Sequence, residues 1–217
     1  MTKIYNINKK LIFDEPDLNL EQTVEKHKAN LGKADLRKAD LRWVDLSGAN
    51  LEKANLRGAY LRNVNLRKAD LSGAILEKAN LREADLSGAD LSNANLSNAD
   101  LREADLVCAD LINVNLICAD LSNADLSGAD LREANLSGVD LSFAILEKAD
   151  LSGADLREAD LSGVYLKGSN LEKANLICAN LRYANLQEAD LSGADLRGVY
   201  LFQANLERAN LKGTILK

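Results

Sequence analysis

A leucine occupies every fifth position of this chain from Leu31 to Leu216, thirty-eight times without an exception. The residue two places before each leucine is small, and it is alanine at thirty of these positions. The residue immediately before each leucine is Asp or Asn at thirty-two positions, and the two residues after it are mostly polar. A fixed repeat constrains the fold more strongly than local propensity does, so the period of five is interpreted first.

Neither a regular α-helix nor a flat β-strand can use a period of five. In a helix, five residues turn through about 500°, so successive leucines would wander around the axis. In a flat strand, successive leucines would point to opposite faces, because the side-chain period is two. Within one unit, however, the alanine and the leucine are two residues apart and share a face. Short extended segments that turn the same way every five residues satisfy both facts, so the chain must coil with Ala and Leu inward.

The unit at residues 34–38, Ala-Asp-Leu-Arg-Lys, resembles the repeat of the pentapeptide-repeat family, whose pattern is A(D/N)LXX. The resemblance covers roughly residues 29–217 and implies an all-β solenoid, namely a right-handed, four-sided parallel β-helix. The period itself gives five residues per side, whereas the number of sides comes from the resemblance alone. The repeats would then form about nine and a half coils, a rod on the order of 45 Å long at about 4.8 Å per coil. Glycines after the leucines are expected at the corners, where a positive φ is required.

Residues 1–28 do not carry the repeat, and we expect them to form an N-terminal capping segment. Residues 4–7 and 10–13 are rich in apolar residues and flank Asn8-Lys9, which favours a small hairpin. Asn19 and Gln22 have the spacing of a capping box and predict a short helix over about 20–28. Because the terminal coils of a solenoid expose apolar core, this segment is expected to cover the first coil.

The opposite end of the rod lacks a comparable segment in the sequence, since the repeat continues in register to Leu216. An open coil end presents leucines and unpaired backbone groups, which favours association. We therefore expect a homodimer through the uncapped C-terminal coil.

Composition argues against several classes of function. The net charge of −6 and the absence of a basic patch argue against direct nucleic-acid binding. The chain shows neither a signal peptide nor an apolar run long enough for a membrane span, so a cytoplasmic location is expected. Cys108, Cys118 and Cys178 occupy outward positions and predict free thiols, because Cys118 and Cys178 would lie about 14 Å apart. With His27 as the single histidine, we expect no metal, no cofactor, no catalytic residues and no enzyme activity.

Two sets of aspartates recur every fourth unit and should stack along the rod. The first acidic column comprises Asp70, Asp90, Asp110, Asp130 and Asp150, and the second acidic column comprises Asp100, Asp120, Asp140 and Asp160. Such a column could imitate nucleic-acid phosphates or collect cations. Asp and Asn also hydrogen-bond nearby backbone at turns. Because Asp and Asn interchange freely at this position, the local hydrogen-bonding role is favoured.

One predicted side of the rod carries most of the aromatic residues of the repeat. The aromatic surface comprises Trp43, Tyr60, Phe143, Tyr183, Tyr200 and Phe202. The same side carries Arg42, Arg62, Arg82 and Arg102, which could bind an anion but more often form weak exposed ion pairs. Grouped exposed aromatics indicate a contact surface. The alternative is that Trp43 and Tyr60 lie under the cap and the other rings shield neighbouring turns.

The sequence therefore favours a rigid, non-enzymatic scaffold that binds a protein partner, whose identity and pathway it does not reveal. The alternative is a DNA mimic that binds DNA gyrase or another topoisomerase, as some members of the resembling family do. Those members carry a dimerising C-terminal helix and sometimes protruding loops, whereas the repeat here runs to Leu216 with basic residues interspersed. The modest net charge also weakens the mimic interpretation.

Overall fold

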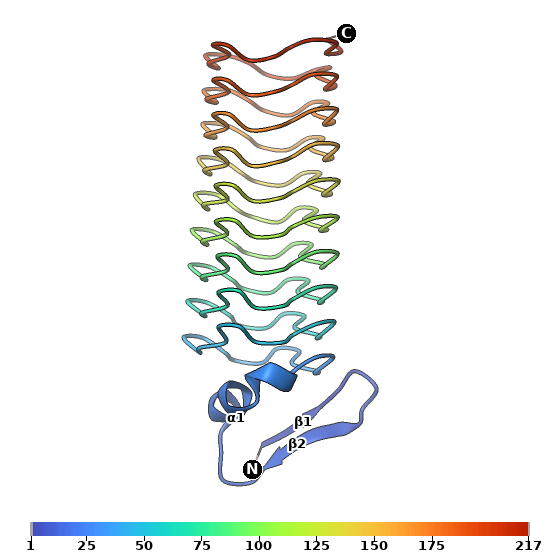
Figure 1. Ribbon diagram of the computed structural model, residues 1–217, viewed down its shortest axis with the longest axis vertical. Coiled ribbons are helices and arrows are strands. Elements are labelled where there is room, and N and C mark those ends of the chain that lie inside the picture. Colours follow the sequence, from blue (N-terminus) through green and yellow to red (C-terminus); the bar gives the residue numbers. More distant parts are fainter. Residues whose placement is uncertain (1, 217) are drawn as a thin grey trace.

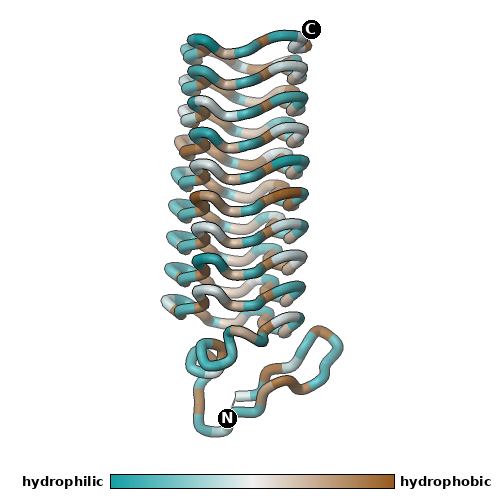
Figure 2. Tube along the Cα trace, in the orientation of Figure 1, coloured by the Kyte–Doolittle hydropathy of each residue, from teal (hydrophilic) through white to brown (hydrophobic). Residues whose placement is uncertain are grey.

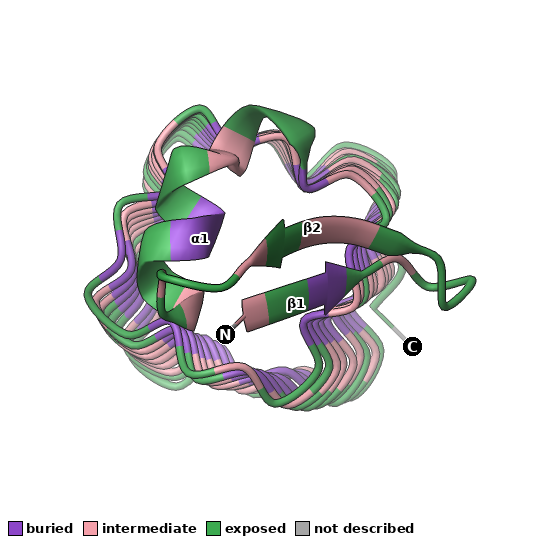
Figure 3. Ribbon diagram, turned by 90° about the horizontal axis from the view of Figure 1, so that it is seen from below, coloured by how far each residue is buried: buried purple, intermediate pink, exposed green. Residues whose placement is uncertain are grey.

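The computed structural model describes residues 2–216. All of them except the N-terminal capping segment form one stack of coils (Figure 1). Each residue before a leucine makes a parallel bridge to the residue twenty positions later, from Asp35 with Asn55 to Asp195 with Ile215. Four pentapeptides therefore complete one coil. The fold is the four-sided parallel β-helix expected from the family resemblance, and viewed along the axis the coils superimpose on a four-lobed outline (Figure 3).

A tight turn forms each corner of the coil. From residue 33 to residue 213, the residue two positions after each leucine has a φ between 53° and 76°. The next N–H donates to the leucine carbonyl oxygen, as from Ala39 to Leu36 at 3.1 Å. A positive φ at the third residue identifies a type II turn. Glycine occupies some of these corners, but so do large residues such as Trp43 and Phe143, for which a left-handed backbone costs roughly 1–2 kcal/mol.

In a pentapeptide with Asp or Asn before its leucine, every backbone N–H has an acceptor, as residues 89–93 illustrate. The N–H groups of Asp90, Leu91 and Asn93 donate to carbonyl oxygens of adjacent coils at 2.7–2.9 Å, and Ala89 closes the turn at 3.0 Å. The remaining N–H, that of Ser92, donates to Oδ1 of Asp90 at 2.9 Å. A buried or half-buried N–H needs a partner. This need explains why Asp or Asn precedes most of the leucines.

The interior of the rod is a continuous column of leucines and small residues. Every leucine from Leu31 to Leu196 has at most 5% of its surface exposed. The chain path correspondingly alternates between apolar and polar residues in each coil (Figure 2). Burying a leucine contributes roughly 1.5–3 kcal/mol before conformational entropy is counted, so the stack supplies a large core despite few aromatic residues.

Within residues 2–216, regular helices and continuous strands occur in the capping segment, whereas the coils are held by isolated bridges. Strands β1 (Thr2–Tyr5) and β2 (Leu11–Glu15) pair antiparallel, followed by the helix α1 (Leu20–Lys26) and a 3-10 turn η1 (Lys28–Asn30). Seen along the axis, α1 and the hairpin lie across the N-terminal end of the rod (Figure 3). The expected hairpin and helix are confirmed, although α1 ends at Lys26 and the chain tightens into η1.

Specific contacts attach this cap to the first coil. Asn19 and Gln22 form the predicted capping box at the start of α1, with hydrogen bonds of 2.8 and 3.1 Å. Val24 of α1 is fully buried in the same core as the leucines. The carbonyl oxygen of Tyr5 accepts the N–H of Asp35 at 2.7 Å, which ties β1 to the edge of the first coil.

At the far end of the described residues the core opens to solvent. Leu211 and Leu216 are 43% and 65% exposed, in contrast to the leucines of the earlier coils. Ile215 is also exposed. Among residues 2–216, no helix is both long enough and apolar enough to span a membrane.

Candidate interaction surface

The aspartate and asparagine side chains before the leucines bind their own corners. From residue 35 to residue 210, each accepts the N–H of the residue two positions later through Oδ1. In the first acidic column these hydrogen bonds measure 2.9–3.2 Å. The bond is the same for Asn95 as for Asp90, at 3.1 and 2.9 Å. The local role inferred from the Asp–Asn interchange is therefore present in the structure.

Parallel bridges join the five members of the first acidic column in adjacent coils. Its charge is nevertheless interrupted, because Arg132 forms a two-pronged pair with Asp130 at 2.6 and 2.8 Å, lowering the pKa of that carboxyl. The run ends at Asn170, whose amide donates to Oδ1 of Asp150 at 3.0 Å. An amide thus relieves the repulsion that another carboxylate would add at this step.

The direction of each arginine that follows a leucine depends on the residue before that leucine. In Asp-Leu-Arg the guanidinium folds back, as Arg102 does onto Asp100 at 2.7 and 2.8 Å, which lowers the pKa of Asp100. In Asn-Leu-Arg or Tyr-Leu-Arg it reaches the next coil, as Arg82 does to Glu103 at 2.6 Å. All four arginines of the predicted basic stack, Arg42, Arg62, Arg82 and Arg102, form such ion pairs.

All six members of the aromatic surface are exposed, between 53% and 74% of their surface. The alternative that Trp43 and Tyr60 lie under the cap is wrong, because they are 74% and 53% exposed. Trp43 sits at a corner with a φ of 67°, which directs its side chain outward from the coil, away from the core that α1 covers.

Towards the C-terminal end the rings contact one another and their neighbours. Tyr183 and Phe202 meet edge to face with centroids 5.8 Å apart. The guanidinium of Arg182, which follows Asn180-Leu181, stacks over the ring of Tyr200 at 5.3 Å. Edge-to-face rings and a cation over a ring are both attractive arrangements.

Phe143 lies flat along the corner because the next coil carries a glycine there. A Cβ at Gly163 would lie only 2.7 Å from the Phe143 ring. Sequence reasoning missed this pair, although the twenty-residue separation would have revealed it. The glycine thus serves the aromatic surface in addition to its positive φ.

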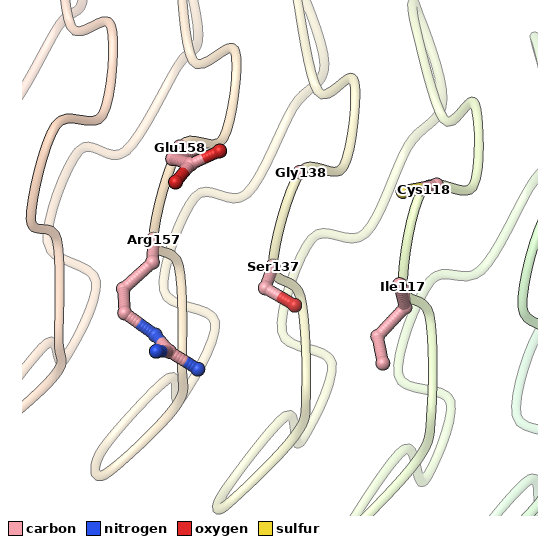
Figure 4. Close-up of a pocket in the computed structure, with 6 residues that line it drawn as sticks. All are labelled: Ile117, Cys118, Ser137, Gly138, Arg157 and Glu158. Atoms are coloured by element: carbon pink, nitrogen blue, oxygen red, sulfur yellow. The ribbon is translucent and has the colours of Figure 1, made fainter.

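A shallow groove lies at the neighbouring corner. It encloses about 270 Å³ and is lined by Ile117, Cys118, Ser137, Gly138, Arg157 and Glu158 from three successive coils (Figure 4). The groove exists because Gly138 contributes no side chain between Cys118 and Glu158. Arg157 is held by Asp155 at 2.6 Å. The groove is wide open, so it offers no enclosed site for a small substrate.

A polar cluster in the cap was not predicted from the sequence. Oε1 of Glu15 in β2 lies 2.8 Å from Nζ of Lys26 and 2.6 Å from Nε2 of His27. These hydrogen bonds lower the pKa of Glu15. The ring of His27 stacks on Phe13, with centroids 4.0 Å apart. The cluster fastens α1 to the hairpin.

Neither a metal centre nor a disulfide is formed by the described residues. Within 2–216, no three His, Cys, Asp or Glu side chains gather in a way that could hold a metal ion. Cys108, Cys118 and Cys178 are free and exposed, each beside a glycine of the following coil.

Comparison with known proteins places this architecture among described relatives. The family profile described as pentapeptide repeats (8 copies) matches overlapping segments that run without a gap from residue 27 to residue 217. The crystal structure of HetL, a pentapeptide repeat protein involved in heterocyst differentiation regulation in the cyanobacterium Nostoc sp. strain PCC 7120, aligns with a TM-score of 0.68 and 35% identity. The alignment covers 92% of this chain and 97% of HetL.

A more distant structure shows the same fold. A trypsin-treated variant of QnrB1, a plasmid-mediated fluoroquinolone resistance protein, aligns with a TM-score of 0.61 and 20% identity. The alignment covers 82% of this chain and 89% of QnrB1. A search of curated proteins found no match.

Proposed function

This chain belongs to the pentapeptide repeat family, and we propose that it acts as a rigid, non-enzymatic scaffold whose aromatic surface binds a protein partner. The grouping of exposed rings on one side carries the proposal, because aromatic residues dominate the binding energy of many protein interfaces. A role in regulation through binding also agrees with the involvement of HetL in heterocyst differentiation regulation. We further propose a cytoplasmic location, since exposed free thiols suit a reducing compartment.

Replacing the C-terminal rings tests the scaffold proposal. Tyr183→Asn, Tyr200→Asn and Phe202→Ser introduce residues that the chain already uses at the equivalent positions of other coils, namely Asn123, Asn180 and Ser122. Crosslinking in cells should capture a partner protein bound to the wild type. We expect the triple variant to fold but not to capture this partner.

The matched control is Tyr165→Asn, which removes an exposed ring from the adjacent side. Equal partner capture by the wild type and the triple variant would contradict the assignment of this surface. Loss in both the triple variant and the control would indicate that the rings act on the fold and not on a partner.

A second candidate function is that the first acidic column imitates the phosphates of DNA and binds a topoisomerase such as DNA gyrase. Stacked carboxylates in adjacent coils favour it, whereas the likeness to QnrB1 at 20% identity concerns the fold alone. The pair of Arg132 with Asp130 in the middle of the column weakens it. A gyrase supercoiling assay tests it: inhibition by the wild type that Asp70→Asn with Asp90→Asn abolishes would support the mimic, and no inhibition would exclude it.

A second copy of the chain is a further candidate partner, through the open coil at the C-terminal end of the described residues. Leu211, Ile215 and Leu216 are exposed there. The N–H groups of Leu201 and Leu206, whose equivalents elsewhere bind the next coil, have no carbonyl partner within 2–216. We expect a dimer in sedimentation equilibrium that Leu211→Lys with Ile215→Lys converts to a monomer. A wild type that is monomeric at high concentration would contradict it.

A further inference from the structure

Carboxylates and aromatic rings run side by side along the C-terminal half of one side of the rod. Asp120, Asp140 and Asp160 of the second acidic column are joined by parallel bridges in successive coils. Three residues after Asp140, Phe143 stands at the adjoining corner. Tyr183 occupies the same corner position two coils later and contacts Phe202. The rod thus presents a strip of carboxylates next to a strip of rings.

Asp120 lies 3.5 Å from Nε of Arg102, whereas the next two carboxylates of this strip, Asp140 and Asp160, have no cationic partner among the described residues. Asp140 and Asp160 each use Oδ1 to accept the N–H of a serine two residues later, at 2.9 Å in both cases, and Oδ1 of Asp160 also accepts the amide of Asn180 at 3.0 Å. Within the described residues neither carboxylate has a Lys or Arg nitrogen at ion-pair distance, and the same holds for Glu158 at the preceding corner. On the N-terminal half of this side, by contrast, the guanidinium groups and carboxylates pair with one another.

The rings beside these carboxylates are suited to receive a cation. Arg182 already stacks over Tyr200 at 5.3 Å, so the surface holds one guanidinium of its own. Phe143 lies along Gly163 and is 59% exposed. A guanidinium binds well where an aromatic face adjoins a carboxylate, because the ring and the charge attract it together. The chemistry of the strip therefore selects an arginine- or lysine-bearing partner.

The spacing of the strip distinguishes between shapes of partner. Successive carboxylates lie one coil apart, about 4.8 Å. A helix parallel to the rod presents one residue per turn at about 5.4 Å. An extended strand presents residues of one face about 6.7 Å apart. Over the step from Asp140 to Asp160 the spacing of the helix differs by roughly 0.6 Å and that of the strand by roughly 2 Å, so the helix holds its cations closer to the two carboxylates.

We propose that the strip formed by Asp140, Asp160, Phe143, Tyr183 and Phe202 is a docking surface for a basic α-helix of a partner protein, with one Arg or Lys per helical turn. The proposal rests on the scaffold function and specifies the chemistry of the partner. The rings supply buried apolar area and cation contacts, and the carboxylates set the register. The partner is expected to lie along the rod axis.

Fluorescence anisotropy with a labelled, alanine-based helical peptide that carries one arginine per turn tests the proposal. The variant Asp140→Asn with Asp160→Asn retains the local hydrogen bond to serine, because the same column already holds Asn80 and Asn180 in that role. We expect the dissociation constant to rise about fivefold or more, since an exposed ion pair contributes up to about 1 kcal/mol.

The matched control is Asp70→Asn with Asp90→Asn, which makes the same charge change on another side of the rod. Those carboxylates also accept the N–H of a serine, at 3.0 and 2.9 Å. The control is expected to change the dissociation constant less than twofold. Phe143→Asn with Tyr183→Asn should weaken binding as well, and added salt should weaken binding to the wild type.

Several outcomes would overturn the inference. The wild type could fail to bind the arginine helix. Both aspartate double variants could weaken binding equally. An extended arginine–serine peptide could bind as tightly as the helix. Loss of self-association in Asp140→Asn with Asp160→Asn would identify a second copy as the occupant. If the cellular partner requires the rings but not Asp140 and Asp160, the scaffold function stands and the basic-helix inference fails.

Discussion

The Asp or Asn that precedes most leucines supplies the acceptor for the one N–H that the neighbouring coils do not reach. Asp90 illustrates this role, because its Oδ1 accepts the N–H of Ser92 at 2.9 Å. We expect Asp90→Ala to lower the free energy of unfolding by about 1–2 kcal/mol, as the half-buried N–H loses its partner. Asp90→Asn should leave it nearly unchanged. Urea unfolding followed by circular dichroism measures both, and equal destabilisation by Asn and Ala would show that charge is what matters.

The glycines at the corners have different surroundings. Comparing substitutions at two of them therefore distinguishes the cost of a positive φ from the cost of a steric clash. No atom lies within 4 Å of a Cβ added at Gly48, so Gly48→Ala should cost only the positive φ, about 1 kcal/mol. Gly163→Ala should cost more, because the Phe143 ring must move. In a Phe143→Asn background the two glycine substitutions should become equal. A difference that persists in this double-mutant cycle would contradict the assigned contact.

Sequence patterns predicted the local hydrogen bond but not the side-chain pairs. The interchange of Asp and Asn was sufficient to favour an uncharged role at turns. The partner of each arginine follows a rule visible only in the structure: Arg102 binds back to Asp100, whereas Arg82 crosses to Glu103. The residue before the leucine, Asp or Asn, indicates which partner the arginine binds. Predicting that partner requires knowing which arginine rotamer reaches the next coil, and the period of the repeat does not give the rotamer.

At the scale of elements, the turn and capping signals of the sequence predicted the hairpin and helix of the cap. They did not predict the side-chain contacts that attach α1 to the hairpin. Asn19 and Gln22 lie three residues apart, so their capping box is local and visible in the sequence. Glu15, Lys26 and His27 meet only because α1 docks on the hairpin. Contacts of this kind arise from packing of elements, for which the non-repetitive segment carries no periodic signal.

Acid should weaken the attachment of the cap to the first coil. Lys26 and His27 lower the pKa of Glu15, and Ser47 with Lys28 lowers the pKa of Asp45 to about 2. A lowered pKa in the folded state stabilises the cap above the unfolded value, about 4, and this contribution is lost as pH falls through the folded value. The protection factors of residues 2–30 against hydrogen exchange should therefore fall between about pH 4 and 2.

The variant Glu15→Gln with Asp45→Asn removes the two carboxylates whose pKa values are lowered at the junction of the cap and the first coil. Its protection factors in residues 2–30 should be lower at neutral pH and should change little below pH 4. Asp90→Asn serves as the control, since it lies several coils away. Unchanged acid sensitivity in the double variant would show that other groups hold the cap.

For the whole molecule, the sequence predicted the coil and its five-residue sides, while the number of sides rested on family resemblance. The parallel bridges between residues twenty apart now define four sides. No sequence period could have given this number, because three or five sides bury the same leucines. Closure at four depends on the angle of each type II turn, which is a property of backbone geometry. The grouping of the aromatic surface follows from the same closure.

Removing a whole coil tests this closure directly. Deleting residues 61–80 should leave a cooperative rod with later residues on their original sides, because each coil contacts only its neighbours. Gly58→Cys and Asn98→Cys would then face each other in adjacent coils, about 4.8 Å apart and within disulfide reach. Cysteine fits both corners, since Cys118 and Cys178 hold the same turn position with φ of 54° and 60°.

The three native cysteines would first be replaced by Asn, which the chain already uses at this corner. Under mild oxidation the engineered disulfide should form in the coil-deleted chain. It should not form in the full chain, where the two cysteines lie two coils apart. Deleting only residues 61–65 provides the matched control, because it moves residue 98 to another side and should also prevent the bond. A disulfide in the five-residue deletion and none in the coil deletion would contradict four-sided closure.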